Sequence, residues 1–132
     1  MESIHISAVI IGVFGHCSEN TIPADNQAIQ KAFFKLSKEY SEILKGLEFD
    51  EENFSQELEN AIESFLCCGM FRIHGDKLET LSISEEIKQH FDTNISQLLS
   101  EYQINKIIEM GSSLPKLLRN NESVRYKRLT KA

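Results

Sequence analysis

The sequence predicts a mainly α-helical chain with one small β-hairpin, and the segment from Asn53 to Ile83 gives the clearest reasons. Apolar residues in its first half recur every three or four positions, which is the spacing of one helical face. Gly69 then fits a left-handed helix C-terminal cap, and two alternating runs flank His74-Gly75-Asp76-Lys77 as in a hairpin. The helical positions are Leu58, Ala61, Ile62, Phe65 and Leu66, and the strand positions are Phe71, Ile73, Leu81 and Ile83. A helix that leads into a hairpin is the second half of a winged helix-turn-helix, so we predict this fold with additional C-terminal helices.

Length and composition favour one structured domain. The chain has 132 residues, of which 41% are hydrophobic, with eight Phe and no Trp, so we expect a core of Phe, Leu and Ile. Its three cysteines, Cys17, Cys67 and Cys68, are odd in number and predict no disulfide framework. We expect them to behave as small buried hydrophobic residues in a cytoplasmic protein.

The N-terminal half is predicted to contain three helices and one short strand. The apolar run around Ile4 to Cys17 lacks a basic leader and falls short of the roughly 20 residues of a membrane span, so it is expected to be a buried first helix. Thr21-Ile22 is expected to form a short strand. Asp25 or Asn26 should cap a long helix that ends at Gly46, and Asn53 or Ser55 should begin the next helix.

Two further helices are predicted after the hairpin. Ser84 should cap a short helix to about Phe91. A second helix should begin at Thr93 or Asn94 and end at Gly111, and its expected apolar face is Ile95, Leu98, Leu99, Tyr102, Ile107 and Ile108. These helices lie outside a minimal winged helix, so they either pack on the first helix or face a partner. We therefore assign residues 1–111 to a winged-helix domain with a C-terminal helical extension.

The C-terminal residues differ from the rest of the chain in charge. Residues 112–132 are expected to form a basic, partly disordered tail, because they contain Pro115, Asn120 and Asn121 and few apolar residues. From residue 115 on, six basic side chains oppose Glu122 alone, a net charge of +5. Since the whole chain carries −6, residues 1–114 carry −11, and a body that acidic repels phosphate backbones.

No catalytic site, metal site or cofactor is predicted. His16-Cys17 and Cys67-Cys68 lack the paired spacing of structural zinc ligands. Catalytic carboxylates need burial or a specific partner to shift their pKa, whereas Asp50, Glu51 and Glu52 belong to a connector and are expected to be solvated. Phosphate-binding, dinucleotide-binding and nucleophile-elbow patterns do not occur. We therefore expect a protein that is not an enzyme.

The helix before the hairpin discriminates between DNA reading and protein binding. A DNA-reading winged helix exposes Arg, Lys, Asn or Gln there and carries basic residues on its wing. The exposed positions here are expected to be Gln56, Glu57, Glu59, Asn60, Glu63 and Ser64, of which three are acidic. The wing offers Arg72 and Lys77 against Asp76 and Glu79. This pattern favours protein contacts, with a DNA-binding transcriptional regulator as the alternative.

Two sets of candidate surface residues follow. The expected partner interface consists of Tyr102, Ile104, Ile108, Arg125, Tyr126, Lys127 and Arg128. The alternative nucleic-acid surface consists of Arg72, Lys77, Lys116, Arg119, Arg125, Lys127 and Arg128. The partner would be a second copy of the chain or a larger subunit. A nucleic acid could instead meet the basic tail, and no membrane contact is expected.

The segment Phe54 to Ile83, with the apolar helix and the long helix before it, resembles winged-helix accessory proteins of bacteria. It resembles in particular the small middle-component subunits of three-component ATPase-containing defence systems. The resemblance covers about 80 residues. It consists of a helix, a glycine and the start of a strand between Leu58 and Phe71, followed by a hairpin and a polar helix start at Ser84. It implies a non-catalytic adaptor that joins a large ATPase to an effector in antiviral defence, and it assigns no functional residues.

Overall fold

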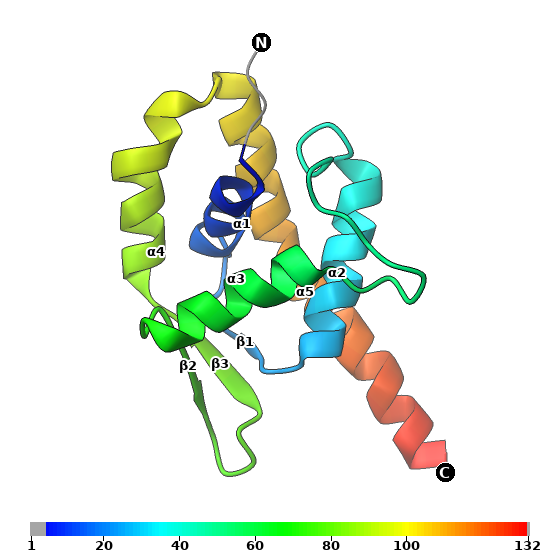
Figure 1. The fold of residues 1–132 in the computed structure, drawn as a ribbon. Helices are drawn as coiled ribbons and strands as arrows, with labels where there is room; N and C mark the ends of the chain where they lie inside the picture. Colours follow the sequence, from blue (N-terminus) through cyan, green and yellow to red (C-terminus); the bar gives the residue numbers. More distant parts are fainter. Residues whose placement is uncertain (1–4, 132) are drawn as a thin grey trace.

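Five α-helices and a three-stranded antiparallel sheet form the described part of the chain (Figure 1). The computed structural model describes the backbone of residues 5–131 and the side chains of residues 5–119. The elements in chain order are α1 (Ile6–Gly15), β1 (Thr21–Pro23), α2 (Asn26–Glu39), α3 (Gln56–Cys67), β2 (Phe71–His74), β3 (Thr80–Ile83), α4 (Glu85–His90) and α5 (Glu101–Lys131). The predicted combination of helices with a small hairpin is therefore confirmed, and β1 is the predicted short strand.

The sheet has β3 in its centre, between β1 and β2. Ile22 of β1 and Ile73 of β2 both lie opposite Leu81 of β3, and Phe71 lies opposite Ile83. Gly69 and Gly75 adopt φ angles of +83° and +102°, so the turns into and within the hairpin use the left-handed region that glycine tolerates best. The inner face of the sheet is buried at Ile22, Phe71, Leu81 and Ile83 and packs under the helices.

Side-chain caps begin the helices at the predicted residues. The Asp25 carboxylate accepts the backbone N–H groups of Gln27 and Ala28, the Ser55 hydroxyl accepts that of Leu58, and the Ser84 hydroxyl accepts that of Glu86. The end of α2 was predicted wrongly, because the helix stops at Glu39 instead of Gly46. Ile43 and Leu44 are nevertheless buried, so the apolar stripe continues as a turn that packs on the core.

Four phenylalanine rings join α1, α2, α3 and the sheet. The Phe14 ring of α1 lies 5.4 Å from Phe33, 6.1 Å from Phe65 and 4.9 Å from Phe71, measured between ring centroids. Phe65 and Phe71 lie 4.9 Å apart. The prediction that Phe65 and Phe71 are buried together with Phe33 and Leu36 is confirmed.

The helix α5 differs most from expectation, because it continues as one helix from Glu101 to Lys131 through Gly111 and Pro115. The predicted helix end at Gly111 and the predicted extended tail from Ser112 are therefore wrong for the backbone. Its buried face is Ile107, Met110, Leu114 and Leu118. A Cβ on Gly111 would lie 2.7 Å from the backbone C and O atoms of His16, so this glycine permits close contact between α5 and α1.

The segment between α4 and α5 is also irregular where a regular helix start was predicted. A π-helical turn (Phe91–Ile95) and a 3-10 turn (Ser96–Leu98) precede α5, so no helix begins at Thr93 or Asn94. The predicted apolar face is right in part, because Ile107 is buried and Ile95 and Leu99 pack against the core. It is wrong for Leu98, Tyr102 and Ile108, which are 78%, 56% and 38% exposed. α4 and α5 both contact α1, as expected if the two C-terminal helices pack on the first helix.

Candidate partner-binding surface

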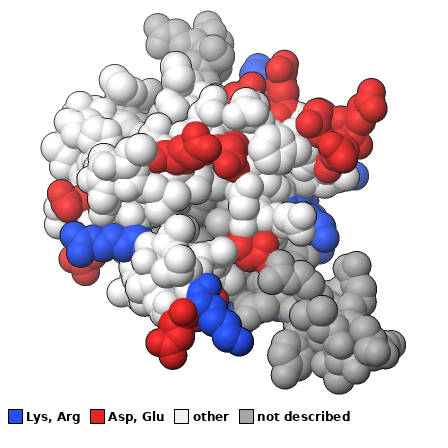
Figure 2. Space-filling model, turned by 60° about the horizontal axis from the view of Figure 1, so that its bottom comes forward, with Lys and Arg blue, Asp and Glu red and all other residues white. Residues whose placement is uncertain are grey.

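The outer face of α3 is acidic. Leu58, Ile62 and Phe65 bury one side of the helix, and the same periodicity places its carboxylates on the other side. No Lys or Arg occurs between Lys45 and Arg72. The acidic residues in that stretch are Glu48, Asp50, Glu51, Glu52, Glu57, Glu59 and Glu63. Figure 2 shows carboxylates both across the middle of the face that carries the hairpin and at its margins, with Lys and Arg side chains scattered among them.

A groove lies between α3 and the hairpin. It encloses about 140 Å³, and its lining residues are Ala24, Asp25, Asn26, Ile29, Glu59, Ile62, Glu63, Leu66, Ile73 and Leu81. Ile73 was predicted as one of the alternating apolar positions of the hairpin, and its side chain is 42% exposed. The groove therefore combines an apolar floor with two carboxylates from α3.

The carboxylate of Glu59 is incompletely satisfied. Its Oε1 atom is buried and has no hydrogen-bond partner among the residues that the structure describes. A buried carboxylate oxygen without a donor is costly, so an added Lys, Arg or N–H donor at this position would be stabilising. The neighbouring Gln56 side chain donates instead to the amide oxygen of Asn60, at 2.9 Å.

The hairpin offers little positive charge. Arg72 on β2 and Lys77 in the turn are exposed, as predicted. Asp76 and Glu79 lie in the same turn, and the backbone N–H of Lys77 donates to the Glu79 carboxylate at 3.2 Å. The turn also presents Leu78, which is 65% exposed and has a φ of 54°. An apolar tip suits protein contacts better than phosphate contacts.

The predicted tail residues are only partly described. Lys116 is exposed, and the Arg119 guanidinium pairs with the carboxylate of Glu19 in the loop before β1. Arg119 therefore ties α5 to the body, and its charge is partly neutralised. Arg125, Tyr126, Lys127 and Arg128 belong to the helical backbone of α5, and their side chains lie outside the described residues.

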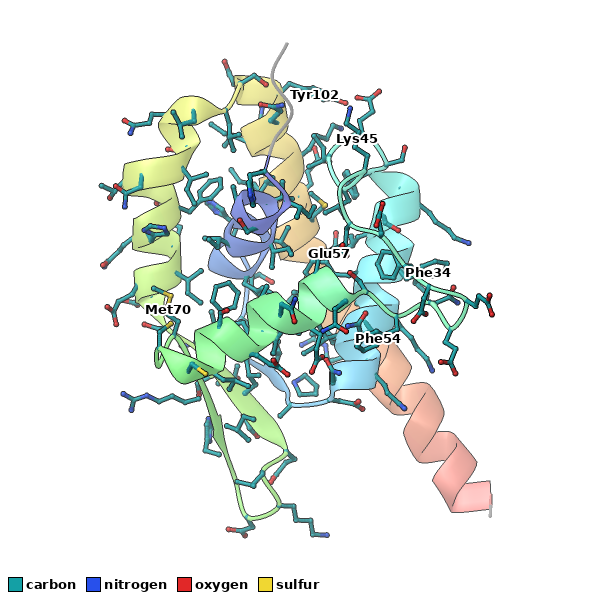
Figure 3. All side chains as sticks on the ribbon, in the orientation of Figure 1. Phe34, Lys45, Phe54, Glu57, Met70 and Tyr102 are labelled. Carbon is teal, nitrogen blue, oxygen red and sulfur yellow. The ribbon has the colours of Figure 1, made fainter. Side chains whose placement is uncertain are left out.

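The predicted interface residues at the start of α5 do not form one patch. Ile104 is half-buried and Ile108 is exposed, and at four residues apart they share a face. Tyr102 lies on another side of the helix, where the Lys106 ammonium is 5.5 Å from its ring centroid. Figure 3 places Tyr102 at the opposite end of the molecule from the hairpin. The structure thus separates Tyr102 from the α3 groove.

His16 is the most perturbed histidine. Its side chain is largely buried against Phe91, and Nε2 lies 3.8 Å from the Asp92 carboxylate. Burial lowers the pKa of His16, with Asp92 opposing that shift and Lys88 adding to it. Among the described residues no cluster of three or more His, Cys, Asp or Glu side chains is arranged to hold a metal ion. Cys67 and Cys68 are exposed, so their predicted burial is wrong.

The groove was missed by the sequence analysis. Ile73 was predicted only as an alternating apolar position of the hairpin, and Glu59 and Glu63 were predicted to be exposed on the helix before it. The absence of any basic residue between Lys45 and Arg72 signals the acidic face of α3, but the sequence carries no signal for the groove itself.

Comparisons with protein-family models, with curated proteins and with solved structures gave no match. No helix among the described residues is both long enough and apolar enough to cross a membrane.

Proposed function

We propose that this chain is a non-catalytic adaptor of winged-helix type that binds a protein through the outer face of α3. The element order α1, β1, α2, α3, β2, β3 and the sheet order β1-β3-β2 support the winged-helix part of the proposal. In such a fold α3 and the hairpin are the parts that meet a partner. The resemblance of residues 54–83 to middle-component subunits adds a bacterial three-component ATPase system, with a role in defence, as the setting.

The observation that carries the proposal is the charge of α3. The helix contains Glu57, Glu59 and Glu63 and no Lys or Arg. A DNA backbone carries one negative charge per about 1.7 Å of duplex, so this face repels it. The same face attracts a cationic protein surface, and the apolar groove beside it supplies area that such a partner can bury.

The second candidate function is DNA binding by a transcriptional regulator. Arg72 and Lys77 on the hairpin and the basic residues from Lys116 to Lys131 favour it. In that case contacts would go to phosphates, and affinity would fall steeply as salt rises.

Fluorescence anisotropy with labelled duplex DNA separates the two candidates. For the adaptor, residues 1–119 should bind no duplex at about 0.15 M salt, and any binding by the full chain should disappear as salt rises. Tight, sequence-selective binding by residues 1–119 would instead establish the regulator.

Affinity capture tests the protein-binding face directly. The full chain should retain one identified partner from its source cells, and Glu57→Lys with Glu63→Lys should lose that partner. Glu85→Lys with Glu86→Lys on α4 is the matched control, because it reverses two exposed charges on another helix. Retention of the partner by the α3 variant, or its loss by the control, would contradict the proposed face.

A further inference from the structure

The groove beside α3 exposes apolar surface that the described elements leave uncovered. Ile73 lies opposite buried Leu81 in the sheet register, yet its own side chain is exposed. Ile62 and Leu66 of α3 complete the apolar floor. Its volume of about 140 Å³ is below the roughly 300 Å³ at which drug-sized ligand sites begin. The groove therefore suits one or two anchoring side chains of a protein segment, which would cover the rest by lying across it.

The charge at the groove specifies what that segment must carry. Glu59 and Glu63 both line the groove, and Oε1 of Glu59 is buried without a donor in the described part of the chain. An apolar anchor flanked by cationic side chains would satisfy the floor and the carboxylates together.

The end of α5 has this composition. Residues 120–131 contain Arg125, Lys127, Arg128 and Lys131 against Glu122 alone. The backbone of α5 is helical to Lys131. Leu118 is the last buried residue of α5 among the side chains that the structure describes. About 18 Å of helical backbone continues beyond Arg119, and its sequence is basic with a few apolar residues.

We propose that residues 120–131 of one copy dock in the α3 and hairpin groove of a second copy. Leu129 covers the apolar floor, and Arg125 and Arg128 face Glu59 and Glu63. The inference rests on the proposed protein-binding role of α3 and names its partner as this same chain.

The geometry allows the exchange to be reciprocal. Figure 1 shows the hairpin and the last turns of α5 extending toward the same side of the molecule. A two-fold axis on that side lets each copy supply its helix end to the other, which closes the assembly as a dimer and places two copies of the contact in one interface.

Sedimentation velocity on the full chain tests the proposal. The wild type should sediment as a dimer, with about twice the 15.1 kDa mass of one chain. The dimer should dissociate as the salt concentration rises. Arg125→Glu with Arg128→Glu should weaken the dimer at least tenfold, as should Glu59→Lys with Glu63→Lys. A chain carrying all four changes should recover the dimer, because the opposite charges then meet again in reversed order.

Controls separate the contact from folding. Glu85→Lys with Glu86→Lys on α4 should leave the dimer intact, and thermal unfolding should show that each variant is folded. Because Glu59 is partly buried, Glu63→Lys alone is the second groove variant, and it should still weaken the dimer. A monomeric wild type, a dimer that persists in the Arg125 and Arg128 variant, or a dimer that Ile108→Asp dissociates instead would overturn the proposal.

The outcome also distinguishes this inference from the proposed function. A monomeric wild type that captures another protein through Glu57 and Glu63 overturns the self-docking contact and leaves the adaptor proposal standing. A wild type that dimerises through the groove and captures no other protein supports self-docking and removes the adaptor role.

Discussion

Gln30 and Ser55 form two hydrogen bonds with each other in the interior of the protein. The Gln30 side-chain nitrogen donates to the carbonyl oxygen of Ser55 at 3.1 Å, and the Ser55 backbone N–H donates to the Gln30 side-chain oxygen at 2.8 Å. Both residues are buried. Ser55 is also the N-cap of α3, so one glutamine on α2 fixes the point at which α3 begins and therefore the direction of its acidic face.

Replacement of Gln30 by Met should destabilise the protein by about 1 to 3 kcal/mol. Methionine keeps the length of the side chain but leaves the buried N–H of Ser55 without a partner, whereas the Ser55 carbonyl keeps its hydrogen bond from the Glu59 backbone N–H. Urea unfolding measures the loss, and hydrogen exchange at the Ser55 amide should accelerate more than exchange in α5. A change below about 1 kcal/mol would show that water replaces both bonds. Gln27→Met, an exposed change on the same helix, is the control.

Replacement of Gly111 by Ala should destabilise the protein by about 1 to 3 kcal/mol. Helix propensity alone predicts the opposite, a gain of up to about 1 kcal/mol. The steric effect should win, because the new Cβ would lie 2.7 Å from the His16 backbone, which is less free to move than a side chain. Thermal unfolding of Gly111→Ala beside Ser112→Ala, at an exposed position one residue on, gives the comparison. Stabilisation by Gly111→Ala would contradict the close contact between α1 and α5.

Truncation of Phe65 to Ala should cost about 3 to 5 kcal/mol. The ring is buried and lies between Phe14 and Phe71, so its removal loses transfer free energy and leaves a cavity in the aromatic cluster. Chemical denaturation measures the free energy of unfolding. Because Leu66 on the same helix is only partly buried, Leu66→Ala should cost clearly less. Equal losses for the two variants would mean that the cluster is not the centre of the core.

The stability of the protein should fall as the pH falls below about 6.5, partly because of His16. Burial lowers the pKa of His16 in the folded state, so the unfolded chain binds a proton there more readily. The contribution of His16 is complete above the unfolded pKa and is lost as the pH drops through the folded pKa. His16→Gln should flatten that part of the stability profile. An unchanged profile in His16→Gln would assign the pH dependence to other groups.

The presence of the first three helices and of the hairpin could be predicted because their signals are local, although α2 ends at Glu39 instead of the predicted Gly46. Ser55 and Ser84 cap the helices for which they were named, and Gly69 ends α3 in the left-handed conformation. The C-terminal half was predicted less well because its decisive contacts are distant in sequence. Gly111 has the local character of a helix terminator, but its role is to admit the His16 backbone, and no neighbouring residue signals that contact.

The candidate site shows the same division. The acidic character of α3 was visible in the sequence, because it depends on composition alone. The groove was not, because the exposure of a strand residue such as Ile73 depends on which elements pack over it, and the alternating pattern does not encode that packing. The separation of Tyr102 from Ile104 and Ile108 could have been anticipated from helical spacing.

The packing of Gly12 and Val13 against α5 joins the two ends of the described chain. A Cβ on Gly12 would meet the Ile107 side chain at 2.7 Å, and Arg119 pairs with Glu19, so partners nearly 100 residues apart complete one interface. On the ribosome the first helix leaves the exit tunnel long before α5 is synthesised. The apolar surface of α1 stays uncovered until α5 has been synthesised, and chaperones can bind the nascent chain during that period. Premature termination in the same period yields an aggregation-prone product.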